Sequence, residues 1–153
     1  MPNKQHSLRG LNFISIKAII LLYRVVCCNF MELDCVRIHG CNVFTSYGDD
    51  YVCIDSVRYA ENLIVLPDRL IHQWTTASFE TLSITDFDFL ASLDVEFILF
   101  GTGQRQRFLR AELLRPLIEK QKACEVMTNH AVCRTYNILA GEGRKVAASL
   151  LFT

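Results

Sequence analysis

The most informative segment of the chain is Val95-Glu96-Phe97-Ile98-Leu99-Phe100-Gly101-Thr102-Gly103. Its apolar run is short and ends at two glycines, which is typical of a strand buried on both faces of a sheet. A second strand is predicted at 123–127. The residues between these strands have the apolar spacing of a helix, with Pro116 either kinking that helix or beginning a new turn. Strand, helix and strand in this order predict a parallel βαβ unit.

Helices and a further strand are expected on either side of this unit. A short helix precedes it and has Ser83 or Thr85 as its candidate N-cap. A longer helix follows it, is capped by Thr128 or Asn129, and ends near residue 141. The last predicted strand covers 145–152. This part of the chain therefore predicts a largely parallel sheet with helices packed against it.

Turns rather than helices divide the part of the chain before residue 83. Strands are predicted at 43–46, 51–54 and 57–59, the first two joined by a turn that contains Gly48-Asp49-Asp50. The run 63–66 is apolar throughout and ends at Pro67, so it predicts another strand buried on both faces. We interpret this half as a β-meander. The fold class is therefore α/β, with three layers: a mostly parallel mixed sheet between helices, and an additional N-terminal β-hairpin or meander.

The composition excludes some classes of function. The chain has 153 residues, of which 51% are hydrophobic and 21% charged, enough to bury a core. Its 16 basic and 16 acidic side chains cancel, so a nucleic-acid binder that works through bulk charge is not expected. The seven cysteines are odd in number and show no metal-ligand spacing with histidines. We expect a reduced cytoplasmic protein with no metal and no cofactor.

Residues 1–30 differ in composition from the rest, because they contain basic residues and no acidic ones. Residues 11–30 resemble a membrane segment, but Lys17 and Arg24 interrupt the apolar run. Three interpretations stay open: an amphipathic surface anchor, a genuine extension, or a segment outside the folded unit. The third is favoured, with Met31 as the natural start. Membrane attachment is not expected, and residues 31–153 are predicted to form a single domain.

Two predicted loops converge at one edge of the sheet. Parallel strands at 95–100 and 123–127 end on the same edge, where open α/β sheets bind ligands. One strand end carries Gly101-Thr102-Gly103, followed by Arg105 and Arg107. The other leads into Asn129 and His130 at the start of a helix. Glycines, a helix start and arginines together suit an anion or a carboxylate. The alternative is a tight strand exit with solvated arginines.

The helix after residue 128 is apolar over most of its surface. Its narrow polar stripe comprises His130, Arg134 and Asn137, which must face water, a cleft or a partner. Cys133 and His130 are three residues apart and could form a nucleophilic pair, but Cys133 projects toward the apolar side. No catalytic residue is therefore assigned.

Several ordered motifs resemble one family, the Mth938-like domains. They include Leu63-Ile64-Val65-Leu66-Pro67-Asp68, Trp74, Phe100-Gly101-Thr102-Gly103, Gln106-Arg107-Phe108, Glu125-Val126-Met127, Cys133-Arg134-Thr135-Tyr136-Asn137-Ile138-Leu139 and Glu142-Gly143-Arg144-Lys145-Val146-Ala147-Ala148. The resemblance covers about 31–152. It implies a five-stranded mixed sheet between helices with an extra hairpin region, and it implies no particular reaction. Thr128 stands where bacterial relatives commonly have Asp, which makes acid–base chemistry at the helix start less credible.

Relatives in that family include a mitochondrial complex I assembly factor, so the resemblance implies an adaptor or assembly role. We expect a non-catalytic adaptor or assembly-factor-type domain that contacts a protein partner. The alternative is a protein or enzyme that binds a small anion at the same edge. The oligomeric state is left open. The predicted ligand- or partner-binding residues are Gly101, Thr102, Gly103, Arg105, Arg107, Asn129, His130, Arg134 and Asn137.

Overall fold

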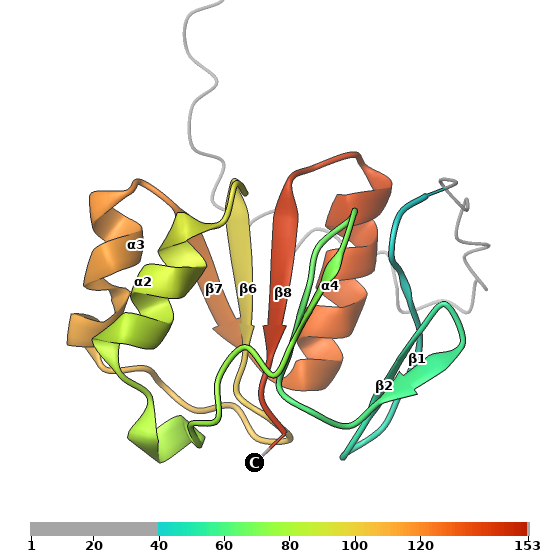
Figure 1. Ribbon diagram of the computed structural model, residues 1–153, viewed down its shortest axis with the longest axis horizontal. Coiled ribbons are helices and arrows are strands. Elements are labelled where there is room, and N and C mark those ends of the chain that lie inside the picture. Colours follow the sequence, from blue (N-terminus) through green and yellow to red (C-terminus); the bar gives the residue numbers. More distant parts are fainter. Residues whose placement is uncertain (1–39, 153) are drawn as a thin grey trace, which may run out of the picture. The chain divides into compact units, whose positions relative to one another are not determined.

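The computed structural model describes residues 40–152 and contains two sheets in that range (Figure 1). The small antiparallel sheet comprises β1 (Phe44–Tyr47), β2 (Val52–Ile54) and β3 (Val57–Tyr59). The central five-stranded sheet has the order β5-β4-β8-β6-β7. Its strands are β4 (Leu63–Val65), β5 (Leu70–His72), β6 (Phe97–Gly101), β7 (Ala123–Met127) and β8 (Val146–Leu150). The α-helices are α2 (Ile84–Ser92), α3 (Arg115–Glu119) and α4 (Asn129–Gly141).

The central sheet confirms the predicted α/β class and its mostly parallel character. Strand β6 pairs in parallel with both β7 and β8, whereas β4 runs antiparallel to its neighbours β8 and β5. Every strand of this sheet except β4 therefore points the same way. The carboxyl ends of β6 and β7 lie at one edge, as the βαβ prediction requires.

The assignment of residues 63–66 to the meander is wrong, because β4 lies inside the central sheet. All three residues of β4 are buried, so the strand needs cover on both faces and a partner on each side. The central sheet provides both, with β5 and β8 as partners. The remaining meander strands form the small sheet, as expected.

Two apolar cores lie on the two faces of the central sheet. One joins Val65, Leu99, Val146, Ala148 and Leu150 to the buried side of α4 and to the small sheet. In this core the ring of Phe44 from β1 meets Tyr136 of α4 edge to face, with centroids 5.3 Å apart. The small sheet and α4 therefore share one core.

The second core lies under α2 and α3, on the other face of the sheet. Phe87 of α2 stacks on Phe100 of β6 at 5.3 Å, and Trp74 meets the same ring edge to face. Figure 1 shows α2 and α3 on one side of the sheet and α4 on the other. Residues 40–152 are thus layered as helix, sheet and helix, with the small sheet in the layer of α4.

Capping residues and a proline determine where α2 and α3 begin. Ser83 is the N-cap of α2, and Asp86 accepts hydrogen bonds from the Ser83 backbone N–H (2.9 Å) and hydroxyl (2.8 Å). Pro116 lies in the first turn of α3, directly after a 3₁₀ turn at Ala111–Leu114. Pro116 therefore begins a new helical turn and does not kink a longer helix.

The expectations for residues 1–30 and for a start at Met31 lie outside the described residues. Within residues 40–152, no helix is long and apolar enough to cross a membrane.

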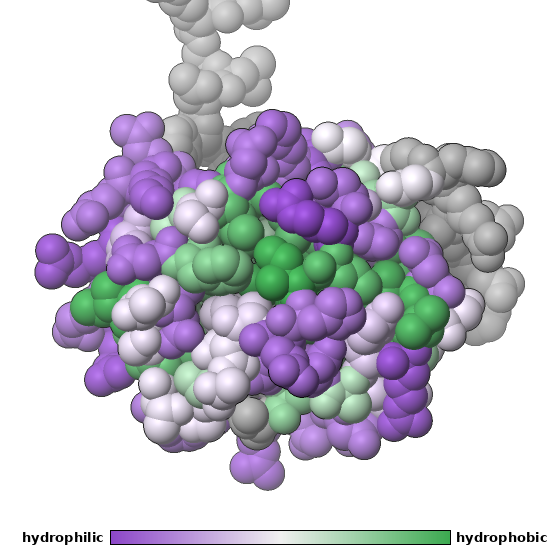
Figure 2. Space-filling model, viewed as in Figure 1, coloured by the Kyte–Doolittle hydropathy of each residue, from purple (hydrophilic) through white to green (hydrophobic). Residues whose placement is uncertain are grey.

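Figure 2 shows a face that is polar along most of its margin and is crossed by an apolar band where Figure 1 draws the strands.

Candidate functional site

The two predicted loops meet, as the parallel strands require. The backbone N–H of Asn129 donates to the Gly103 carbonyl (2.9 Å), and the Asn129 amide oxygen accepts from the Gly103 N–H (3.1 Å). The Asn129 amide nitrogen donates to the Leu151 carbonyl (2.7 Å). Asn129 is buried, so this side chain joins the glycine turn, the start of α4 and the residue after β8. We call this region the carboxyl rim, comprising residues 101–107 and 128–137.

Gly101 is required by the close approach at the carboxyl rim. A Cβ atom at this position would lie 2.3 Å from the Asn129 Oδ1 atom and 3.1 Å from the Ser149 carbonyl oxygen. The first distance is shorter than Cβ atoms adopt in proteins, and the second is shorter than most of their contacts. The glycine therefore lets β6 end directly beneath the Asn129 side chain.

Thr102 and Arg107 hold the loop that leaves β6. The buried Thr102 hydroxyl donates to the Arg105 carbonyl (2.7 Å), and the Arg107 guanidinium donates to the Thr102 carbonyl (2.8 Å). Arg107 also pairs with Glu80 (2.7 Å) and lies over the ring of Phe79, 4.2 Å from its centroid. The guanidinium of Arg107 thus has several partners within its own chain, while Arg105 is exposed.

The polar stripe of α4 faces the small sheet. Asn137 makes both hydrogen bonds of an amide to the backbone of Phe44: it accepts from the N–H (2.9 Å) and donates to the carbonyl (2.8 Å). Arg134 donates to the Tyr47 hydroxyl (3.2 Å). This stripe therefore packs against β1 of its own chain, with Arg134 still exposed at the margin.

His130 connects the stripe to the β1–β2 turn. Its Nε2 atom lies 3.1 Å from the Gly48 carbonyl oxygen and therefore donates to it, and the Asp49 carboxylate is 3.7 Å away. The imidazole also packs on Tyr47, with ring centroids 4.9 Å apart. Gln104 reaches the same turn through the Asp49 carbonyl (3.5 Å). The carboxyl rim is thus completed by residues 47–50.

The thiols at or near the site are poor nucleophiles. Cys133 is fully buried, and this burial raises its pKa to about 12. Burial likewise raises the pKa of Cys124 to about 12. In the described residues there is no group of three or more His, Cys, Asp or Glu side chains arranged to hold a metal ion. The site can therefore offer hydrogen bonds and charge, rather than a thiolate.

Sequence reasoning missed several members of the site. The sequence pattern predicts only a turn around Gly48 and Asp49, and it gives no signal for Tyr47 or Glu80 as part of the site. The contacts of these residues with α4 and Arg107 span 27 to 87 residues along the chain. Local patterns carry no signal for such pairs. The Gly-Asp-Asp turn was visible as a turn, but its packing against His130 was not.

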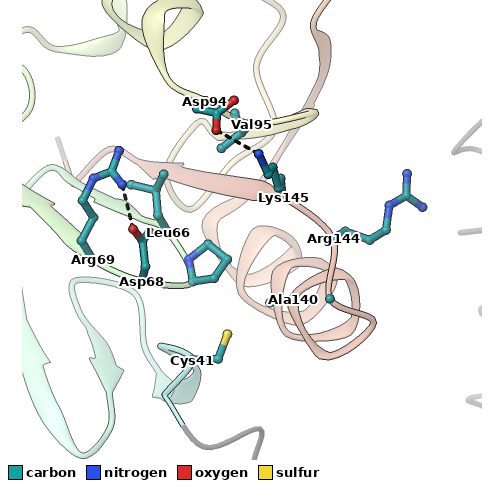
Figure 3. A pocket seen from close by; sticks show the side chains of 11 residues that line it. Cys41, Leu66, Asp68, Arg69, Asp94, Val95, Ala140, Arg144 and Lys145 are labelled. Carbon is teal, nitrogen blue, oxygen red and sulfur yellow. Dashed lines mark hydrogen bonds and ion pairs between the residues drawn. The ribbon is translucent and has the colours of Figure 1, made fainter.

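A hollow of about 350 Å³ lies away from the carboxyl rim (Figure 3). It is bordered by the β4–β5 turn, the residues before β6 and the end of α4. Cys41 and the ion pairs Asp68–Arg69 and Asp94–Lys145 line it. It contains none of the predicted site residues, because it lies toward the amino ends of the parallel strands.

The fold and the carboxyl rim define a small α/β domain with a mixed five-stranded sheet and an attached antiparallel sheet. The chain belongs to the family described as protein of unknown function (DUF498/DUF598), whose model matches residues 44–151. A crystal structure of a Bordetella parapertussis protein is similar at 32% identity and a TM-score of 0.69, covering 76% of this chain and 99% of that one. A solution structure from Bordetella pertussis, described as an Mth938-like domain, is 29% identical with a TM-score of 0.64, covering 80% and 92%. These findings confirm the predicted family.

A curated relative has a named role. It is the NADH dehydrogenase [ubiquinone] 1 alpha subcomplex assembly factor 3 of Bos taurus, 28% identical over 69% of this chain. The match covers 58% of the bovine protein, so the chain spans little more than half the length of that relative.

Proposed function

We propose that this protein is a non-catalytic adaptor or assembly-factor-type domain that works through protein contacts at the carboxyl rim. The assembly-factor name of the bovine relative supports an assembly-type function. The working surface comprises Gly101, Thr102, Gly103, Arg105, Arg107, Asn129, His130, Arg134 and Asn137. Their roles differ: the buried Thr102 and Asn129 shape the rim, whereas Arg105 and Arg134 are exposed and can reach a partner.

One observation carries the choice of a protein partner over a small anion. Three backbone N–H groups that would hold an anion at this edge already have partners in the chain: the Gly103 N–H donates to the Asn129 side chain, the Thr102 N–H donates to the Met127 carbonyl, and the Asn129 N–H donates to the Gly103 carbonyl. Anion binding at a helix start uses free amides. Exposed arginine side chains around a hydrogen-bonded rim suit a broad protein contact.

The test is a reconstituted interaction. The protein is used to isolate a partner from its own cells, and the purified partner is titrated against the wild type and Arg134→Glu. We expect the charge reversal to weaken binding, while Arg69→Glu, an exposed arginine of the β4–β5 turn that borders the hollow away from the carboxyl rim, leaves it unchanged. Equal affinities would contradict the proposal. Stabilisation by a phosphorylated or carboxylated metabolite that grows with its concentration, and is lost in Arg105→Glu, would favour the small-anion alternative.

A further inference from the structure

The strongest unassigned feature is an exposed aromatic ring beside the carboxyl rim. Phe108 follows Arg107 in the loop from β6 to α3, and 87% of its surface is accessible. Ile118, the next most exposed large apolar residue in residues 40–152, is 67% accessible. A phenylalanine held in water forgoes the stabilisation that burial of its ring would give. Such a ring is suited to an apolar pocket on another molecule.

The loop presents Phe108 on a fixed backbone. On one side, Arg107 is held by Thr102, by Glu80 and by the ring of Phe79. On the other side, Leu109 packs into the core under α2 and α3, and Arg110 donates to the Leu82 carbonyl (3.3 Å). Because the residues on both sides contact the body of the domain, the backbone at Phe108 is held in place and its ring is left exposed. A preorganised anchor loses little conformational entropy when it binds.

The charges around the ring indicate the chemistry of the partner. Residues 104–112 contain three arginines and a single acidic residue, Glu112. Arg107 is paired with Glu80, whereas Arg105 and Arg110 are exposed and form no ion pair within the described residues. An exposed aromatic residue between arginines has the composition of an energetic centre in protein interfaces. The complementary surface is an apolar pocket bordered by carboxylates.

We propose that Phe108 is the anchor of a docking site for an acidic protein surface, with Arg105 and Arg110 contacting its carboxylates. This inference rests on the proposed function and assigns it a contact point. Protein is favoured over membrane because a single ring with Gln104, Gln106 and Glu112 around it offers a bilayer little apolar area. The acidic residues of the chain outside this loop also disfavour an anionic bilayer.

The experiment places the photoreactive p-benzoylphenylalanine at position 108, 118 or 134 of the full chain in its own cells. We expect position 108 to form an adduct with a protein at an acidic and apolar face, and position 118 to form none. The purified partner is then titrated. Phe108→Ser should raise the dissociation constant about tenfold or more, and Ile118→Ser by less than about twofold. Arg105→Glu should also weaken binding, and added salt should weaken wild-type binding.

Several results would overturn the inference. These are adducts equal at 108 and 118, an adduct only with a second copy of this chain, unchanged affinity in Phe108→Ser, or a contacted face without carboxylates. Phe108-dependent flotation on phosphatidylcholine vesicles with about a quarter phosphatidylglycerol would assign the ring to a membrane instead. Adducts at 134 but not at 108 would reject this inference and leave the proposed function standing. No adduct at any of the three positions would reject both.

Discussion

Gly101 matters to the carboxyl rim because it has no side chain beyond a hydrogen atom. Any side chain there would enter the space of Asn129, which is fixed by bonds to Gly103 and Leu151. We predict that Gly101→Ala lowers the free energy of unfolding by about 1–3 kcal/mol, as overpacking does in other cores. Chemical denaturation measures this change.

Gly141 is the matched control for that substitution. It is the last residue of α4, and a Cβ there would meet nothing within 4 Å. Gly141→Ala should be neutral or stabilise the protein by up to about 1 kcal/mol, because alanine favours the helix. Equal losses in the two variants would show that the contact with Asn129 is not the cause.

Cys133 provides a prediction about reactivity. Burial raises the pKa of its thiol to about 12, so the thiolate is scarce at neutral pH and the sulfur is shielded. We predict that iodoacetamide leaves Cys133 unmodified in the native protein and modifies it fully in denaturant, as peptide mass spectrometry can follow. Modification of native Cys133 at the rate of a free thiol would reopen the possibility of a nucleophilic thiol.

Asp86 links the N-cap of α2 to pH. Burial opposes its ionisation, but hydrogen bonds from Ser83 and Thr75 prevail and hold its pKa below the ordinary value of 3.8. A lowered pKa in the folded state stabilises the protein above the unfolded-state pKa, and this stabilisation is lost as the pH falls through the folded-state value.

The corresponding variant is Asp86→Asn. It should cost about 1 kcal/mol of unfolding free energy at neutral pH, a typical value for a weakened cap. The difference from the wild type should shrink below about pH 4, where the wild-type carboxylate becomes protonated. Denaturant titrations at several pH values measure this difference in the free energy of unfolding. A difference that stays constant down to pH 2 would mean that the charge of Asp86 contributes nothing.

Asn137 determines how one element attaches to another. Its amide replaces a strand partner for Phe44, bonding both the N–H and the carbonyl of that residue. We predict that Asn137→Ala destabilises the protein by about 2 kcal/mol, since two backbone groups lose their partner. Hydrogen exchange should accelerate at the Phe44 amide first and leave β6 protected. Uniform acceleration across the central sheet would instead indicate global loss of stability.

The elements were predictable where a local rule determines them. The buried strand before Gly101 and the strand at 123–127 followed from patterns within a few residues. For the cap of α4 the pattern left Thr128 or Asn129, and the structure has Thr128. The prediction was wrong where the sheet to which a strand belongs depends on distant segments. Leu63 pairs with Leu150, so the place of β4 is decided by residues more than 80 positions away.

The candidate site was predictable to a similar extent. That Gly103 and Asn129 meet follows from two parallel neighbouring strands. That the stripe of α4 meets Phe44 and Tyr47 does not, because a polar helix face looks alike whether it faces water or another part of the chain.

For the molecule as a whole, the single domain expected over residues 31–153 stays a prediction. The apolar side chains of β1 to β8 pack among themselves in two clusters that run from Phe44 to Leu151. We predict that a fragment covering 31–153 unfolds in one cooperative transition, at the same midpoint as the full chain within about 2 °C. Calorimetry of both proteins tests this. A markedly lower midpoint for the fragment would place residues 1–30 within the cooperative unit.

Strand β8 has a further consequence for biosynthesis. It lies between β4 and β6 in the sheet although it is the last strand of the described chain. While a ribosome is still translating residues before Val146, the strand that separates β4 from β6 is missing. The central sheet therefore cannot form completely, and its two cores cannot pack. This architecture therefore delays completion of the native sheet until residue 150 has left the exit tunnel.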